Sequence, residues 1–173
     1  MNKQKAFTLI ELAIVLLVIG ILAGLMLRNV GVYSIQARDA KRKGDLRNLS
    51  VNLVQYNAAY GHYPTGTNLV SALKSIGVIN LPSTPRSGEY YYYYPCSVSG
   101  VSGFTHFILK TTFEQSSSTN PGLYADSYNS DSLPSGWTCN KADAVAFSGD
   151  STTTVNEDIK CSNSTANNYC IAQ

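Results

Sequence analysis

One acidic residue lies inside a long apolar segment near the start of the chain. Residues 7–27 are apolar apart from Thr8, Glu11 and two glycines. As a helix they would reach roughly 31 Å, about the thickness of the hydrocarbon core of a bilayer. A carboxylate in such a span costs about 2.5–3.5 kcal/mol and usually has a partner. No basic residue lies within helical reach of Glu11 inside the span, so we expect its partner to come from another molecule or from a new charge at Phe7.

The residues before Phe7 indicate how such a charge would arise. Residues 1–6 contain two lysines and end in Ala6. This segment is too short for a secretory leader, and cleavage of a secretory leader falls after the apolar run. Cleavage between Ala6 and Phe7 would instead keep the apolar helix and expose a new α-amino group.

A resemblance to type IV prepilins and type II secretion pseudopilins rests on the run Lys5-Ala6-Phe7-Thr8-Leu9-Ile10-Glu11 and its apolar tail. In that family a membrane peptidase cuts before the aromatic residue and N-methylates it, which implies cleavage after Ala6 and methylation of Phe7. The glutamate, here Glu11, then neutralises the amino terminus of a neighbouring subunit as helices pack into a filament. The family usually has glycine where this chain has Ala6.

Two other interpretations of the apolar run are weaker. An uncleaved single-pass anchor with a stray acid does not explain why the leader, the aromatic residue and the acid fall together. A buried helix of a soluble protein does not explain why the run is apolar on every face.

The apolar pattern continues beyond residue 27 with helical spacing. One stripe contains Val30, Tyr33, Ala37, Ala40 and Gly44, and a second contains Leu46, Leu49, Leu53, Tyr56 and Tyr60. Such stripes predict an amphipathic helix with one buried face. We therefore expect one helix over residues 7–60, roughly 80 Å long. Many family members carry proline where this chain has Arg28. Because glycine is unfavourable in a helix interior, Gly20 and Gly24 are the expected positions of local unwinding on assembly, or equally positions of close helix packing.

After a turn near Gly61 and Pro64, the pattern changes towards strands. We expect a short helix over residues 68–76, strands over 90–94 and 104–113 joined by a hairpin loop, and a further strand over 144–147. The tyrosine strand should have one face on the helix and one face in water. The rest, to residue 173, reads as polar loop.

This order predicts an α+β fold like that of type IV pilins, in which a long N-terminal helix packs on a small antiparallel sheet. The expected divisions are a leader (1–6), a membrane-spanning or filament-core helix (7–27), an amphipathic helix (28–60) and an extracytoplasmic head (61–173). The resemblance around the tyrosine strand is weaker than that of the N-terminal motif.

Charge is unevenly distributed along the chain. Residues 28–47 carry six basic and two acidic residues, whereas residues 48–173 carry five basic and eight acidic ones. The positive-inside rule alone would place the C-terminal part in the cytoplasm. Its polar composition, its four cysteines and the family resemblance instead predict a cytoplasmic N-terminus and a head outside the inner membrane, later on an extracellular pilus.

All four cysteines lie in the polar half: Cys96, Cys139, Cys161 and Cys170. An even number of cysteines in an extracytoplasmic, loop-rich region predicts disulfides. Of three pairings, Cys96–Cys139 and Cys161–Cys170 are favoured. A zinc site is disfavoured because the chain has no CxxC pair and no histidine close to a cysteine.

Other sites have little support in the sequence. No catalytic or cofactor motif appears, so we expect no enzyme activity. Calcium is the one cofactor considered, with Asp126 and Asp131 as first candidates among several acids that include Glu157, although they match no spaced loop. His62 and His106 are interpreted as solvated or core-edge residues. Basic residues 38–47 are interpreted as a solvated helix face with i,i+4 pairs such as Asp39–Lys43, with DNA contact as a secondary interpretation.

Three functions compete. The first is a structural subunit of a type IV pilus, which implies other pilin subunits, a prepilin peptidase and N-methyltransferase, an inner-membrane assembly platform and membrane lipid as partners. The second is a pseudopilin of a type II secretion system. The third is a non-polymerising binding module on a membrane anchor. The disulfides and the long polar C-terminal region favour the pilus.

Overall fold

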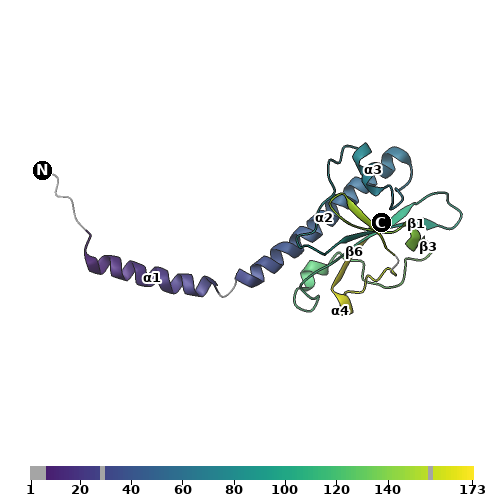
Figure 1. Ribbon diagram of the computed structural model, residues 1–173. Helices are drawn as coiled ribbons and strands as arrows, with labels where there is room; N and C mark the ends of the chain where they lie inside the picture. Colours follow the sequence, from purple (N-terminus) through teal and green to yellow (C-terminus); the bar gives the residue numbers. More distant parts are fainter. Residues whose placement is uncertain (1–6, 28–29, 156–157) are drawn as a thin grey trace. The chain divides into compact units, whose positions relative to one another are not determined.

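The computed structural model describes residues 7–27, 30–155 and 158–173. They fall into two compact units, one ending at Ala37 and one running over Arg38–Gln173. The helices and strands follow in chain order (Figure 1): α1 (Leu9–Leu27), α2 (Val30–Tyr60), α3 (Leu69–Ser75), β1 (Tyr91–Val98), β2 (His106–Thr112), η1 (Pro121–Tyr124), β3 (Trp137–Cys139), η2 (Lys141–Asp143), β4 (Val145–Ser148), β5 (Ser151–Thr154), α4 (Asn163–Ala166) and β6 (Asn168–Ala172).

The first unit contains α1, whose side chains are exposed from Leu9 to Met26. Helix α1 runs through Gly20 and Gly24 without interruption. The position of Arg28, where a kink was considered, lies outside the described residues. The prediction of one continuous helix over residues 7–60 is therefore untested at residues 28–29.

In the second unit, α2 packs on an antiparallel sheet. Within the described residues, the sheet order is β5-β4-β1-β2-β6, and β3 pairs with β1 beside β4. In the central hairpin Tyr92 pairs with Lys110 and Cys96 with His106. The expected α+β architecture, a long N-terminal helix followed by an antiparallel sheet with disulfides, is confirmed.

The main core lies between α2 and one face of the sheet. Leu46, Leu49 and Leu53 of α2 are buried against side chains of four strands, among them Tyr91, Tyr93, Phe107, Leu109, Val145, Phe147 and Tyr169. Of the second predicted stripe, these three leucines are therefore buried. The first predicted stripe is not buried, since Tyr33, Ala37 and Ala40 are exposed.

The opposite face of the sheet carries a second core, which contradicts the prediction that the tyrosine strand has a wet face. Tyr94 is buried there with Ile108, Ala146 and both disulfides. These side chains alternate with those of the main core along β1, β2 and β4, as the pleat of a sheet requires. The segments that follow β2 cover this face, so β1 and β2 are buried on both sides.

The sequence between residues 114 and 173 is more ordered than the predicted polar loop. It contributes β4 near the predicted position, and also β3, β5 and the edge strand β6 beside β2. Short strands of Ser, Thr, Asn and Tyr carry little apolar alternation, so periodicity does not reveal them.

Candidate assembly site

Glu11 lies in the first turn of α1, where Thr8 supplies its hydrogen bonds. The Thr8 N–H and hydroxyl donate to Glu11 Oε2 over 2.8 and 2.7 Å, and the Glu11 N–H donates to Thr8 Oγ1 over 3.3 Å. This arrangement is a capping box, which satisfies donors that the first turn of a helix leaves without intrahelical partners. The expectation of an external partner for Glu11 overlooked this neutral one, although the spacing Thr8-x-x-Glu11 is visible in the sequence.

The residues around the predicted cleavage point are only partly described. Phe7 is exposed and directly precedes the capping box. Ala6 and the rest of the leader lie outside the described residues. Cleavage after Ala6 and methylation of Phe7 therefore stay predictions.

Helix α1 has the length and composition of a membrane-spanning segment. Over Leu9–Met26 it is, within the described residues, the one helix long and apolar enough to cross a bilayer. Its single acid lies in the first turn, close to the end of the span, where a carboxylate is nearer to the polar interface than at the centre.

A buried ion cluster ties α2 to the sheet in the second unit. We call Asp39, Arg42, Glu89 and Glu114 the Arg42 cluster. Arg42 contacts Asp39 Oδ1 at 2.5 Å and Glu114 Oε1 at 2.9 Å, and it also pairs with Glu89. Arg42 and Asp39 are 1% and 0% exposed. The predicted solvated face is therefore wrong for Arg42, whereas Lys41 and Arg47 are exposed and Lys41 pairs with Asp45 at i,i+4.

The backbone after β2 completes this cluster. The N–H groups of Glu114 and Gln115 each donate to the Asp39 carboxylate over 3.0 Å. Two further carboxylates and two backbone donors thus surround the Asp39–Arg42 pair, which is how buried ions avoid the full cost of desolvation. Sequence reasoning missed the cluster because its members are up to 75 residues apart.

Arg38 adds a fork of two hydrogen bonds to the exposed side of this cluster. Its Nε and Nη2 atoms donate to the two oxygens of Glu114, each over 2.6 Å. Hydrogen bonds from Arg38 and, against the effect of burial, from Arg42 lower the pKa of Glu114 to about 2. Glu114 is therefore ionised wherever the head is expected to work.

A second ion cluster joins α2 to β6 through Asp126. Its Oδ1 lies 2.5 Å from Lys43 Nζ, Arg47 pairs with Oδ2, and the Tyr169 hydroxyl donates to Oδ2 over 2.9 Å. Although partial burial opposes ionisation, these groups hold the pKa of Asp126 well below its usual range. Lys43 also lies 5.3 Å from the centre of the Tyr169 ring.

These contacts correct two predictions. Lys43 pairs with Asp126 instead of with Asp39, and Asp39 pairs with Arg42 at i,i+3. Both oxygens of Asp126 are occupied by cations and a hydroxyl, so the structure does not support Asp126 as a calcium ligand. The other candidate, Asp131, accepts the Ser162 N–H over 2.8 Å. Glu157 lies outside the described residues.

Two disulfides link the C-terminal segments. Cys96 is bonded to Cys139 and Cys161 to Cys170, the same pairs that the sequence favours. Within the described residues, no group of three or more His, Cys, Asp and Glu side chains is arranged to hold a metal ion.

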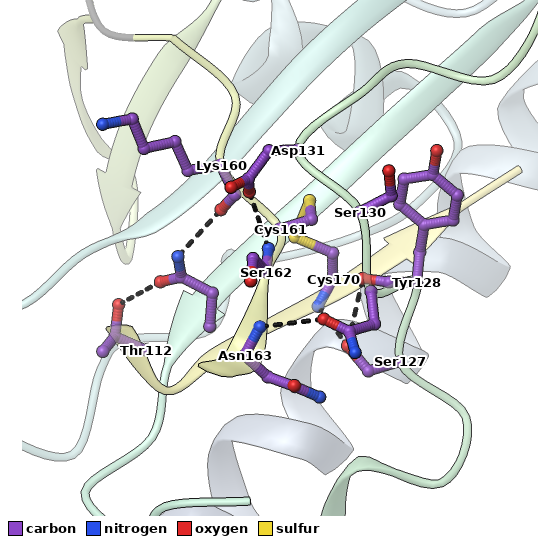
Figure 2. The surroundings of a disulfide bond; sticks show 12 residues. Thr112, Ser127, Tyr128, Ser130, Asp131, Lys160, Cys161, Ser162, Asn163 and Cys170 are labelled. Carbon is purple, nitrogen blue, oxygen red and sulfur yellow. Dashed lines mark hydrogen bonds between the residues drawn. A yellow bond between two sulfur atoms is a disulfide. The ribbon is translucent and has the colours of Figure 1, made fainter. Parts of the chain in front are cut away.

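Figure 2 shows how the segment 127–131 lies against the Cys161–Cys170 disulfide. The Asn163 N–H donates to Asn129 Oδ1 over 2.9 Å, and the Cys170 N–H donates to Ser127 Oγ over 3.0 Å. Tyr128 N–H donates to the Cys170 carbonyl over 2.9 Å. Alternate side chains and the backbone of this segment therefore cover the outer edge of β6.

The two histidines occupy different places. His106 contacts the Trp137 ring, with ring centres 4.2 Å apart, and His62 lies edge-on to Tyr56 at 6.0 Å. Among the described residues, neither histidine lies in a group of three or more His, Cys, Asp and Glu side chains that could hold a metal ion.

Comparison with known proteins bears on the N-terminal region first. Residues 1–27 match the family described as the prokaryotic N-terminal methylation motif. Over 90 residues, 52% of this chain, the sequence is 33% identical to the type II secretion system core protein G of Klebsiella michiganensis and 36% identical to that of Escherichia coli (strain K12). The chain carries a class III signal and is a distant homologue of core protein G.

The homology has a defined extent. The matched segment covers 60% and 59% of the two core G proteins, so the chain spans about three fifths of the curated relatives it matches. No solved structure matches the chain significantly. The motif and the relatives nevertheless agree with the pilin-like architecture described above.

Proposed function

We propose that this chain is a pseudopilin-type subunit that polymerises through its N-terminal helix. Residues 1–6 are removed by a prepilin peptidase, Phe7 is N-methylated, and Glu11 pairs with the amino group of Phe7 on a neighbouring copy. The observation that carries the proposal is the methylation motif on a fully exposed apolar helix whose one acid lies in its first turn.

The named relatives favour the secretion system over the pilus. The disulfides and the long polar C-terminal region favour a pilus subunit, whereas both relatives above are type II secretion proteins. We therefore prefer the pseudopilin to the pilus subunit. Residues 7–27 then form the membrane or filament-core part, and residues 61–173 form a head outside the inner membrane.

The capping box gives the carboxylate two successive environments. Before assembly, Thr8 donates two hydrogen bonds to Glu11 and reduces the cost of a carboxylate near the bilayer. During assembly, a charged amino group comes to the same carboxylate, and two opposite charges attract more strongly among packed apolar helices than in water. This charge pair therefore favours the filament over the free subunit.

Intact-mass measurement tests the processing step. The full chain is expressed with a prepilin peptidase and purified from membranes, and its mass should equal that of a chain that starts at N-methyl-Phe7. A mass that still includes Met1 would favour the uncleaved anchored module and overturn the proposal.

Polymerisation is tested by Glu11→Val with Glu11→Asp as the matched acidic control. We expect Glu11→Val to accumulate in membranes at the level of the unmodified chain but to yield no filaments in sheared fractions examined by electron microscopy. Filaments at unmodified yield from Glu11→Val would exclude the proposed role of the carboxylate. Fibres recovered from the cell surface, identified by mass spectrometry, would favour the pilus over the secretion system.

A further inference from the structure

The central strand pair of the sheet opens at one end, beside the Arg42 cluster. Strands β1 and β2 pair in register as far as Tyr92 and Lys110. Continued by two residues, this register would bring Tyr90 opposite Thr112, but among the described residues no backbone hydrogen bond joins these two. The ladder between the strands therefore ends before β2 itself does.

The backbone of Thr112 faces this opening. On the other side of β2, the Phe113 N–H donates to the Asn167 carbonyl over 2.9 Å. Because the backbone groups of successive strand residues point to opposite sides, the N–H and C=O of Thr112 point towards β1. They are therefore available as one donor and one acceptor to a molecule that enters the opening.

A pocket of about 280 Å³ occupies the opening. Its lining includes Tyr90 and Tyr92 from one strand and Thr111 and Thr112 from the other. Pockets that hold small molecules begin at about 300 Å³, so this one has room for a single small ligand. Tyr90 is 43% exposed, which leaves part of its ring open to such a ligand.

One buried hydroxyl in the lining lacks a partner. Thr111 is 2% exposed, and within the described part of the chain its hydroxyl makes no hydrogen bond. The neighbouring Thr112 hydroxyl, by contrast, donates to Asn168 Oδ1 over 3.2 Å. Since buried polar side chains are nearly always hydrogen-bonded, the unpaired Thr111 hydroxyl indicates an occupant that the chain itself does not supply.

The charges beside the pocket balance one another. Glu89 and Glu114, which also line the pocket, both pair with Arg42. With Arg38 and Arg86, which pair with Glu114, the Arg42 cluster contains three carboxylates and three guanidinium groups. A charged ligand would meet a group of like charge beside each group of opposite charge, so the lining favours an uncharged one.

We propose that this pocket binds a neutral sugar ring. A sugar ring has an apolar face of C–H groups, which suits the exposed ring of Tyr90. Its hydroxyls both donate and accept, as the Thr111 hydroxyl and the Thr112 backbone require. It also carries no charge and is small enough for the pocket. This site lies wholly in the second unit and goes beyond the proposed function, because sugar binding does not depend on polymerisation.

Saturation-transfer NMR tests sugar binding to the full chain in micelles of a detergent without a sugar headgroup. The probes are glucose, galactose, N-acetylglucosamine and their methyl glycosides, because a free sugar and the end of a polysaccharide present the same ring. We expect at least one probe to receive saturation at millimolar concentration, and binding of either form supports the proposal. Glucuronate and glucosamine add a charge to the same ring and should bind more weakly than glucose.

Variants place the sugar in this pocket. Tyr90→Ala should weaken binding by roughly fivefold or more, because it removes the stacking surface. Its matched control is Tyr33→Ala, an exposed tyrosine of α2 in the other unit, which should leave binding unchanged. Thr111→Val keeps the side-chain shape without the hydroxyl and should weaken binding by about threefold or more. Thermal unfolding checks that each variant is folded, and the exposed Tyr90 gives a test even if Thr111→Val is not.

Three results would overturn the proposal. Absence of saturation transfer to every neutral probe would mean that the pocket holds only water. Equal binding by Tyr90→Ala and Tyr33→Ala would place any bound sugar elsewhere. Stronger binding of glucuronate or glucosamine than of glucose would show that the ligand is charged. None of these results bears on assembly through Glu11.

Discussion

Arg42 lies one helical turn after Asp39, and its guanidinium contacts the Asp39 carboxylate at 2.5 Å with both side chains buried. This pair stands where α2 enters the head, since the second compact unit begins at Arg38. Because Asp39 also accepts two N–H groups that follow β2, the pair fixes α2 to the segment after β2 about one turn before the buried Leu46.

Removing one partner of this pair should therefore be costly. We expect Arg42→Met to lower the free energy of unfolding of the head by about 3–5 kcal/mol, because it leaves buried carboxylates without a cation. Arg38→Met is the matched control, since Arg38 is part-exposed and should cost about 1 kcal/mol or less. Urea unfolding of the full chain in detergent micelles measures both. Equal effects would show that burial of Arg42 is not decisive.

Low pH should reduce the stability that the Arg42 cluster contributes to the head. The pKa of Glu114 is lowered to about 2, so its contribution is complete above the pKa of an unfolded glutamate and is lost as the pH falls towards 2. We expect stability to drop by about 2 kcal/mol between roughly pH 5 and pH 2 through this group. Glu114→Gln should remove that part of the pH dependence, measured by thermal unfolding at each pH. An unchanged profile in Glu114→Gln would contradict the assignment.

The capping box makes a local prediction at the membrane end. Thr8→Val removes the hydroxyl and should destabilise the first turn of α1 by about 1 kcal/mol, whereas Thr8→Ser keeps the cap. Hydrogen exchange of the first-turn amides, in detergent micelles, should be faster in Thr8→Val than in Thr8→Ser. Indistinguishable exchange in the two variants would mean that the hydroxyl does not support Glu11.

The backbone at Gly66 packs closely against the backbone at Asp143. A Cβ there would collide with the main-chain carbonyl of Asp143 and crowd Val145, the first residue of β4. We expect Gly66→Ala to destabilise the head by roughly 1–3 kcal/mol. Gly122→Ala is the control, because its nearest neighbour would be at 3.9 Å. Thermal unfolding compares the two, and a neutral Gly66→Ala would show that the loop moves freely.

The two disulfides should differ in their contributions to stability. The Cys96–Cys139 bond spans 43 residues and the Cys161–Cys170 bond spans nine. By the chain-entropy model, replacing the first pair with alanine should cost about 1 kcal/mol more than replacing the second. Urea unfolding followed by fluorescence of Trp137, in the strand that holds Cys139, measures the difference. The opposite order would indicate that local packing outweighs loop length.

Features that depend on local sequence patterns were predictable, whereas contacts between residues far apart in the chain were not. The apolar span, Glu11, the leucine stripe and the hairpin were accessible because each is a local periodic pattern. The Arg42 cluster was not, since the seven charged residues from 38 to 47 look the same in the sequence whether they are solvated or buried. The acidic partners of Arg42 and Lys43 on other segments are Glu89, Glu114 and Asp126, and only the folded structure shows that these residues contact α2.

The double burial of the tyrosine strand has a consequence for how the exterior of the head can vary. Because both faces of β1 and β2 are covered, the surface seen from outside is built largely from the segments after β2. Those segments are fastened at a few points, namely two disulfides, Asp126 and the turn 127–131. Exposed loop residues between these points and the strands β3 to β6 can change in identity and length without altering the sheet, so subunits that share one framework can present different outer surfaces.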